Sequence, residues 1–276
     1  MVGVLVAAMC GSGLLFYLND RNAHQQWKSA GTIEQAAWLD LTVTVQRVDT
    51  ADQQLVLNVL PEPRGTLRSP EDDTFTQDVS LFTSSLRQTS IRITKGSQAI
   101  LQQVTLPLYD GVVTDYPFDR YNAEIAWAAT GPNGPLPVAM GVQIVDPFFV
   151  IHDQDVREIP YALSLEARFS RSRGTFILAW FMMAAMWTLS LTVLASTILL
   201  VRKRGGVVWP ALGWMAATLF ALVGLRNAAP GSPPIGSLID YVAFFWSEAI
   251  IAGSVACVVV FGIAAERRNL PPVPPA

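Results

Sequence analysis

The chain has 276 residues, of which 51% are hydrophobic and only 15% are charged. A soluble domain typically carries about 25% charged residues, so this composition argues against an ordinary soluble protein and favours a membrane protein. The formal net charge is −3, which argues against nucleic acid as a partner. Cys10 and Cys257 both lie in apolar stretches, which excludes a disulfide within residues 19–173 and a four-cysteine zinc site.

The first predicted element is an N-terminal transmembrane anchor at residues 1–18. Residues 2–18 carry no charged side chain. A cleaved signal peptide is the alternative, but the basic segment and the small-residue cleavage motif that such a signal needs are both missing. We therefore expect an uncleaved span.

Residues 19–173 are predicted to form a β-sandwich. Leu39, Leu41, Val43 and Val45 alternate with polar residues, which is the period of a half-buried strand. Similar alternation recurs at residues 55–59, 91–93, 142–144 and 163–169. Segments rich in proline and glycine separate these stretches. The pattern predicts seven to nine strands in an all-β antiparallel sandwich.

Three apolar segments predict membrane helices at residues 176–201, 207–225 and 239–265. Each is close to or above the roughly 20 residues that a helix needs to cross a bilayer. The predicted fold class is thus an α-helical membrane protein with four spans, one N-terminal and three C-terminal within residues 174–265, and an inserted sandwich. The proline-rich end of the chain, residues 266–276, is predicted to be a disordered cytoplasmic tail.

Charge distribution predicts the orientation of these spans. Residues 202–204 and 267–268 are all basic, whereas residues 19–173 contain 13 Lys/Arg and 19 Asp/Glu. Basic loops favour the cytoplasmic side, so we expect a multi-pass protein of the plasma (inner) membrane with an extracytoplasmic sandwich. Arginines on the opposite side weaken this bias: Arg168, Arg171, Arg173 and Arg226.

Three of these arginines lie where the sandwich joins the second span. Arg168, Arg171 and Arg173 fall in the sequence RFSRSR just before residue 176. Basic side chains at this position can reach lipid phosphates, so we interpret them as interfacial anchors and membrane lipid as a partner.

Few residues suggest catalysis. The histidines are His24 and His152, and none of the common nucleophile, zinc-protease, phosphate-loop or dinucleotide motifs is present. His152, Asp153 and Asp155 could bind a divalent ion, but a solvated turn is the simpler interpretation. We expect no catalytic residue, no metal and no cofactor.

Two acids fall in the last predicted span. Asp240 stands at its start and Glu248 lies eight residues further on, about 12 Å along a helix. Acids at such depth are costly unless they are paired, protonated or hydrated. Arg226 ends the preceding span and could pair with Asp240. A packing role and a functional role, as an ion pathway or a partner-binding polar position, both remain open.

The segment DYPFDRY at 115–121 is predicted to be a turn at the junction of sandwich and membrane. Its central residues are Tyr116, Pro117, Phe118, Asp119 and Arg120. Pro117 and Phe118 would pack at the junction, while Asp119 and Arg120 would make local bonds or meet Arg226. A turn at the far end of the sandwich is the alternative.

The order of elements resembles an actinobacterial membrane family known by its domain of unknown function 4436. The resemblance rests on an N-terminal span, a β-rich domain, a basic loop between spans and the stretch RNAAPGSPPIGSLIDYVAFFWSE. It implies the architecture over nearly the whole chain and implies no activity.

The chain also resembles pentameric ligand-gated ion channels. Those channels carry an aromatic-Pro-Phe-Asp motif, which here corresponds to Tyr116, Pro117, Phe118 and Asp119. They also continue from a β-sandwich directly into a span and have a short basic turn between spans, like VRKRGG here. The chain departs from them in lacking flanking cysteines, a further span after the third and a polar stripe on the would-be pore helix.

Function is expected from these features to be non-enzymatic. We expect an accessory, scaffold or sensor subunit with an outer binding domain coupled to its helices, associated with other membrane protein subunits or with copies of itself. A homo-oligomeric channel-like protein is the alternative, and an enzyme acting on lipid or glycan is a further one.

Overall fold

The computed structural model describes residues 11, 13–18, 21, 28–31, 36–85, 89–159, 162–203 and 208–269. The chain forms two compact units. The first comprises the residues up to 113 together with 118–174, and the second comprises residues 114–117 and those from 175 onward. The chain therefore passes into the helical unit at 114–117, returns, and enters it again at 175.

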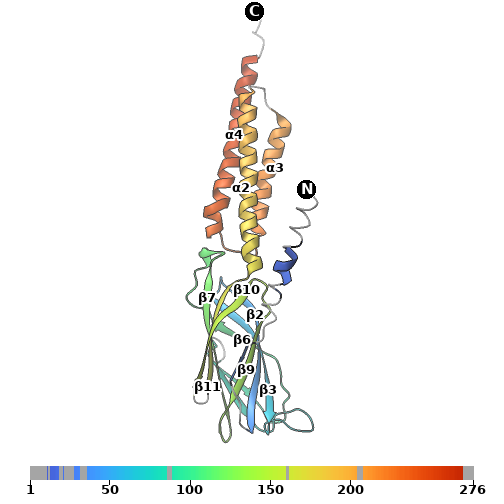
Figure 1. Cartoon of the computed structure of the whole chain (residues 1–276), viewed down its shortest axis with the longest axis vertical. Coiled ribbons are helices and arrows are strands. Elements are labelled where there is room, and N and C mark those ends of the chain that lie inside the picture. Colours follow the sequence, from blue (N-terminus) through green and yellow to red (C-terminus); the bar gives the residue numbers. More distant parts are fainter. Residues whose placement is uncertain are drawn as a thin grey trace, which may run out of the picture. The chain divides into compact units, whose positions relative to one another are not determined.

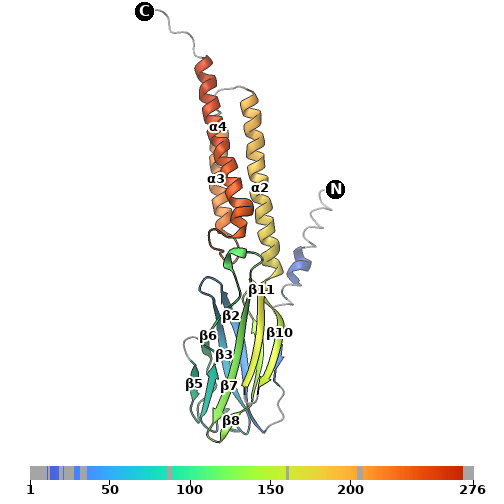
Figure 2. The ribbon, with the colours of Figure 1, turned by 90° about the vertical axis from the view of Figure 1, so that its left-hand side faces the viewer.

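The first unit is built from two β-sheets (Figures 1 and 2). One sheet has the strand order β1 (Lys28–Ala30), β9 (Val138–Ile144), β2 (Ala37–Asp49), β3 (Gln54–Gly65), β6 (Gln102–Pro107). The other has the order β10 (Phe149–Ile159), β11 (Ala162–Arg171), β7 (Arg120–Gly131), β4 (Val79–Thr83), β5 (Ser90–Ile93), with β8 (Gly134–Leu136) beside β7.

The core of this unit lies between the two sheets and explains the alternation in the sequence. In β2, the side chains of Leu39, Leu41, Val43 and Val45 are fully buried, whereas the residues between them are partly exposed. Trp127 of β7 contributes the largest buried side chain of the opposite sheet. Because burying a side chain of the size of leucine contributes about 1.5–3 kcal/mol, this inward-facing set stabilises the sandwich predicted from the sequence.

Two details of the predicted sandwich are wrong. The described residues form eleven strands rather than seven to nine, since β1 and β8 are only three residues long and β7 was not recognised. The sheets are also not wholly antiparallel, because β2 pairs with β9 in parallel, with Leu39 opposite Val138. The long chain between these two strands, which includes β3 to β8, makes a parallel pairing possible.

The second unit contains three long helices, α2 (Arg173–Arg202), α3 (Trp209–Asn227) and α4 (Phe245–Asn269) (Figure 1). The first two residues of α2 still belong to the first unit. A π-helical turn, η2 (Asp240–Phe244), directly precedes α4. Each helix, with η2 counted as part of the last, is long and apolar enough to cross a membrane. The predicted spans at 176–201 and 239–265 fall on helices, as does that at 207–225 from Trp209 onward, and the chain has the features of a membrane protein. Proline at the first turn of α3 suits a helix start, where no backbone donor is required.

The two ends of the chain differ from the prediction or lie partly outside the described residues. Of the predicted anchor at 1–18, residues 13–18 are helical, while 1–10 and 12 lie outside the described residues, so the N-terminal span stays a prediction. The predicted disordered tail at 266–276 is wrong at its start, because α4 continues to Asn269. Arg267 and Arg268 favour a helix C-terminus through the helix dipole. Residues 270–276 lie outside the described part.

Candidate functional site

The DYPFDRY segment contains the point where the chain changes from one unit to the other. A short 3-10 helix, η1 (Val113–Asp115), leads to a cis peptide bond between Tyr116 and Pro117. Tyr116 is fully buried and belongs to the hydrophobic cluster of the helical unit. Phe118 is half exposed, and Asp119 is buried in the first unit.

Asp119 is held by a buried ion pair within the sandwich. The guanidinium of Arg171 donates to both carboxylate oxygens of Asp119, with N–O distances of 2.8–3.1 Å. Tyr121 donates its hydroxyl to the same carboxylate at 3.1 Å. The guanidinium of Arg171 also lies 4.2 Å from the centre of the Phe149 ring, which supports the cation from its other side. Asp119 is therefore bonded within the sandwich, to a residue 52 positions away and to its near neighbour Tyr121.

Burial raises the pKa of the Tyr121 phenol above its usual value, and the negative charge of Asp119 raises it further. The phenol therefore stays protonated and available as a donor. Tyr121 is 1% exposed, so this hydrogen bond is shielded from water.

The predicted interfacial role of Arg171 is wrong. Its side chain is 2% exposed and is directed at Asp119, because β11 alternates and places residue 171 on the inward face. Arg168 is exposed and donates to Asn122 of the neighbouring strand at 3.3 Å. Arg173 is exposed at the start of α2. A lipid contact thus stays a prediction for Arg168 and Arg173.

The residue between Arg171 and α2 is fixed as firmly as Arg171 itself. Ser172 donates its backbone N–H to the carbonyl of Phe148 at 2.8 Å and its hydroxyl to that of Pro147 at 3.1 Å. Asp146 in turn accepts hydrogen bonds from the backbone N–H groups of Val48 and Phe148, both at 2.8 Å. The end of β11 is therefore tied to the sandwich up to the residue that precedes α2. The sequence signal for this arrangement was the turn-forming DPF at 146–148, which was not recognised.

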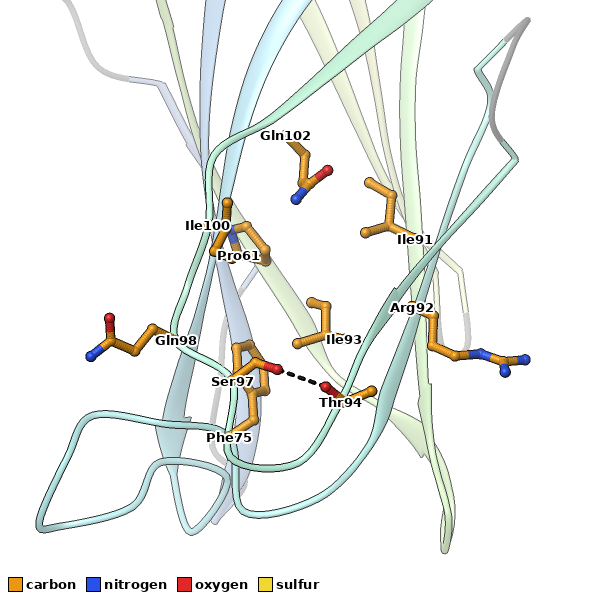
Figure 3. Close-up of a pocket in the computed structure, with 10 residues that line it drawn as sticks. All are labelled: Pro61, Phe75, Ile91, Arg92, Ile93, Thr94, Ser97, Gln98, Ile100 and Gln102. Atoms are coloured by element: carbon orange, nitrogen blue, oxygen red, sulfur yellow. Dashed lines mark hydrogen bonds between the residues drawn. The ribbon is translucent and has the colours of Figure 1, made fainter.

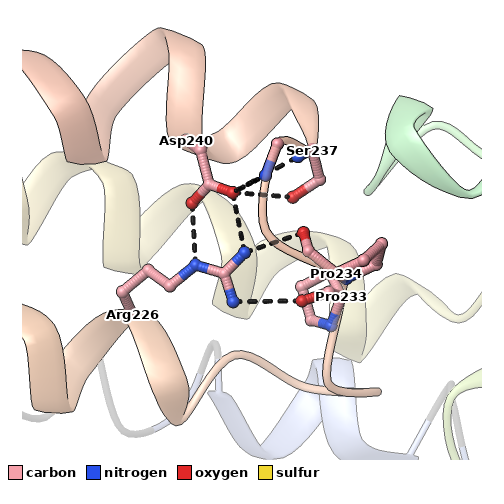
Figure 4. Close-up of polar contacts among 6 residues, drawn as sticks. Arg226, Pro233, Pro234, Ser237 and Asp240 are labelled. Atoms are coloured by element: carbon pink, nitrogen blue, oxygen red, sulfur yellow. Dashed lines mark hydrogen bonds and ion pairs between the residues drawn. The ribbon is translucent and has the colours of Figure 1, made fainter.

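A second buried ion pair lies in the helical unit (Figure 4). Arg226 donates from Nε and one terminal nitrogen to the two carboxylate oxygens of Asp240, each at 2.7 Å. Its remaining donors reach the carbonyls of Pro233 and Pro234 at 3.0 and 2.8 Å. This confirms the pair that the sequence suggested and adds the proline loop as a partner of the arginine.

Asp240 also organises the start of its own helix. One carboxylate oxygen accepts from the backbone N–H groups of Gly236 and Ser237, at 2.8 and 3.2 Å. Ser237 and Asp240 have the spacing of a capping box, in which an acid at the third helical position binds back to the N-cap. The sequence SLID contains this signal, which was not recognised. Asp240 is 0% exposed and its charge is fully compensated.

The π-helical turn η2 connects α4 to α2. A π-turn shifts the hydrogen-bonding pattern of a helix by one residue, so a carbonyl can become available to another partner. The carbonyl of Val242 accepts from the indole N–H of Trp187 in α2 at 3.1 Å. This hydrogen bond attaches η2, which carries Asp240 and directly precedes α4, to the middle of α2.

Glu248 has a different environment from Asp240, although the two acids share one predicted span. It is partly buried, and none of the described residues donates a hydrogen bond to it or forms an ion pair with it. Asp240 is thus paired within the helical unit, whereas Glu248 has no such partner among the described residues.

The segment HDQD lies on strand β10, not in a turn. A register shift occurs between His152 and Gln154, and Asp155 pairs with the exposed Arg157 at 3.3 Å. Arg157 also reaches Glu166 of β11 at 3.4 Å. Among the described residues, no three side chains of the metal-binding types lie together.

A small cavity of about 100 Å³ opens beside the edge strand β5 (Figure 3). Phe75, Ile91, Ile93 and Ile100 supply apolar walls, and Ser97 and Thr94 share a hydrogen bond of 2.7 Å at its border. The guanidinium of Arg92 points away from the cavity. Its chemistry suits an apolar group and offers no charged ligand.

Arg120, the remaining residue of the predicted junction, is exposed at the start of β7. The structure thus brings Asp119 together with Arg171, and Arg226 with Asp240 and the proline loop. Tyr116 and Pro117 are grouped with the helices, whereas Phe118, Asp119 and Arg120 are grouped with the sandwich.

Comparison with known proteins divides the chain within the last strand, β11. Residues 29–166 match the family model "Domain of unknown function (DUF4436)", and residues 171–265 match a second, "Domain of unknown function (DUF8686)". No curated protein matches the chain. The family resemblance therefore covers the sandwich rather than nearly the full chain, and the helices carry a separate match. By the match over its sandwich, the chain belongs to the DUF4436 family.

Proposed function

We propose that this protein is a non-enzymatic subunit of the plasma membrane, in which an extracytoplasmic sandwich binds a partner and the helices hold it in a membrane complex. In this proposal the N-terminal segment is an additional anchor. The basic residues after α2 and at the end of α4 favour the cytoplasmic side, which leaves the start of α2 and the sandwich outside. Accessory, scaffold and sensor roles all require this arrangement.

The observation that carries the proposal is the absence of a linker between β11 and α2. Arg171 and Ser172 are both bonded within the sandwich, and α2 begins at the next residue. A freely tethered domain would instead have a flexible linker of several residues.

The mass and composition of the native assembly test this proposal. The full chain, tagged and extracted gently from membranes of its own host, is expected to elute with one or more different membrane proteins in fixed ratio. A chain that elutes alone as a stable monomer would contradict the proposal. A closed ring of identical chains would replace it with the channel-like alternative.

The homo-oligomeric channel-like protein remains a second candidate because of one specific observation. The aspartate of the YPFD segment is bonded to Arg171, on the strand that leads into the first membrane helix after the sandwich. This order of a YPFD segment, a last strand and a membrane helix is the one on which the resemblance to channels rests. Current across a planar bilayer from the purified ring would support this candidate, and a non-ring assembly without current would exclude it.

A further inference from the structure

Glu248 lies well inside the apolar layer and not at its edge. The apolar part of α3 extends from Trp209 to Leu225, about 26 Å at 1.5 Å per residue, which is close to the hydrocarbon thickness of a bilayer. The Arg226–Asp240 pair marks one end of this layer. Glu248 follows Asp240 by eight residues, so it lies about 12 Å further in.

The position of Glu248 around α4 places it at the border of the packed side. Ser247, Ile251, Ser254 and Val258 are buried, and these residues define the face of α4 that packs in the unit. Residues 245, 249, 252 and 256 are exposed, and Glu248 lies between the two groups. Its carboxylate can therefore reach a molecule that approaches the exposed side.

The described helices supply no cation to Glu248. Their basic residues all stand at helix ends: Arg173, Arg202, Arg226, Arg267 and Arg268. Arg226 is already occupied by Asp240. In a symmetric assembly of this chain, Glu248 would meet other copies of Glu248 at the same depth, without a positive charge. Charge complementarity thus points to a different protein.

We infer that Glu248 marks the docking face for a transmembrane helix of another protein, and that this helix carries a lysine or arginine at the depth of Glu248. The inference rests on the proposed function and specifies the partner's chemistry. An unpaired acid in the hydrocarbon layer is costly, and a basic partner removes that cost. Beside Glu248 the exposed side of α4 contains Ala249, Ala252 and Ala256, and small residues allow a second helix to approach closely.

Site-specific photo-crosslinking in membranes of the native host tests the inference. A photoreactive amino acid replaces Ala252, one turn from Glu248, and a matched chain carries it at Cys257, which is also exposed but lies on the other side of α4. Mass spectrometry then identifies the attached peptide. We expect a peptide from an apolar segment of a different membrane protein that contains Lys or Arg, with a much lower yield from position 257.

Variants of the charge at position 248 test whether Glu248 is responsible for the crosslink at position 252. Glu248→Gln is expected to lower the yield at position 252 about tenfold or more, while Glu248→Asp keeps it within about threefold. Exchanging the charges, with Glu248→Lys and an acid in place of the partner's basic residue, should restore the yield.

Three results would overturn the inference: adducts with lipid only, adducts with a second copy of this chain, or an unchanged yield in Glu248→Gln. The proposed function is tested separately by the native assembly. If the complex with other membrane proteins persists in Glu248→Gln at the wild-type ratio, the proposed function stands and the docking face is wrong.

Discussion

The two buried arginine–aspartate pairs differ in the groups that satisfy their remaining hydrogen bonds and contacts. In the sandwich, Asp119 and Arg171 are 52 residues apart, and side chains complete their environment: the Tyr121 hydroxyl and the Phe149 ring. In the helical unit, Arg226 and Asp240 are 14 residues apart, and backbone groups of the intervening loop complete theirs.

This difference shows what each pair stabilises. The sandwich pair joins two strands that also pair through their backbones, so it adds to a structure that the sheet already defines. The helical pair flanks a loop with three prolines. Because proline has no backbone N–H, this loop offers few donors to its own carbonyl groups. Arg226 supplies those donors, and Asp240 supplies the acceptor for the start of its helix. Loss of the helical pair should therefore have the larger effect.

The largest effect is expected from Asp240→Ala. The change leaves the buried Arg226 without its counter-charge and leaves two backbone N–H groups without an acceptor, so the free energy of unfolding should fall by about 3–5 kcal/mol. Reversible unfolding of the purified full chain in mixed detergent measures it. Asp155→Ala removes an exposed ion pair and serves as the control, with an expected loss of about 0–1 kcal/mol. Equal losses in both variants would contradict the structural role of Asp240.

A smaller loss is expected from Asp119→Asn. The amide keeps the shape and one acceptor but removes the negative charge, so the loss should be about 2 kcal/mol, the scale of a hydrogen bond to a charged group. Hydrogen exchange of the full chain measures this loss, and the exchange rates of the backbone amides in β7 and β11 should increase. Asp110→Asn is the matched control, because Asp110 is exposed and accepts from Asn122 at 3.2 Å. Faster exchange confined to the helices would refute the assignment of this pair to the sandwich.

Tyr121→Phe should lower the free energy of unfolding by about 1 kcal/mol at neutral pH, because it removes one buried hydrogen bond. The pH dependence has a defined sign. Burial raises the pKa of Tyr121 in the folded state, so its contribution is complete below about pH 10 and is lost as the pH rises above that value. The difference in the free energy of unfolding between the wild type and Tyr121→Phe should therefore decrease as the pH rises above about 10. Denaturant titrations between pH 7 and pH 11 follow this difference, and a constant difference would exclude a buried phenol.

The smallest effect is expected from Glu248→Gln in the isolated protein. Because Glu248 has no partner among the described residues, its replacement removes no interaction, and the free energy of unfolding should fall by no more than about 0.5 kcal/mol. The free energies of unfolding of Glu248→Gln and Asp240→Ala, measured on the purified chains under the same conditions, compare the two acids of this predicted span. A loss above about 2 kcal/mol would show that Glu248 has an internal partner and would remove the basis for the docking face.

Local patterns made several parts of the structure predictable. Strands β2, β3 and β11 follow from alternation, since one face of each packs on the core and the other does not. Strand β7 alternates too, with Tyr121, Ile125 and Trp127 buried, but small alanines between them weakened the hydrophobic signal. The Arg226–Asp240 pair was predictable because one short loop separates its members.

Other parts depend on contacts between distant segments. Arg171 was interpreted as a lipid anchor because its neighbours in sequence are basic and precede a span. Its actual partner is 52 residues away, and only the register that pairs Phe169 with Tyr121 brings the two strands together. The lack of a partner for Glu248 among the described residues likewise could not be predicted, since it depends on which groups the other helices bring near its carboxylate.

The sequence by itself determined several of the strands, among them β2, β3 and β11, which segments are apolar enough to cross a membrane, and where the last strand leads into the first of these segments. These properties follow from residue type and period, which act over a few neighbouring residues. The tertiary structure alone decided that Asp119 meets Arg171, that β2 pairs in parallel with β9, and that Glu248 is left without a partner. Those outcomes depend on how distant segments pack, because a buried charge is stabilised only by groups that the fold brings within hydrogen-bonding distance.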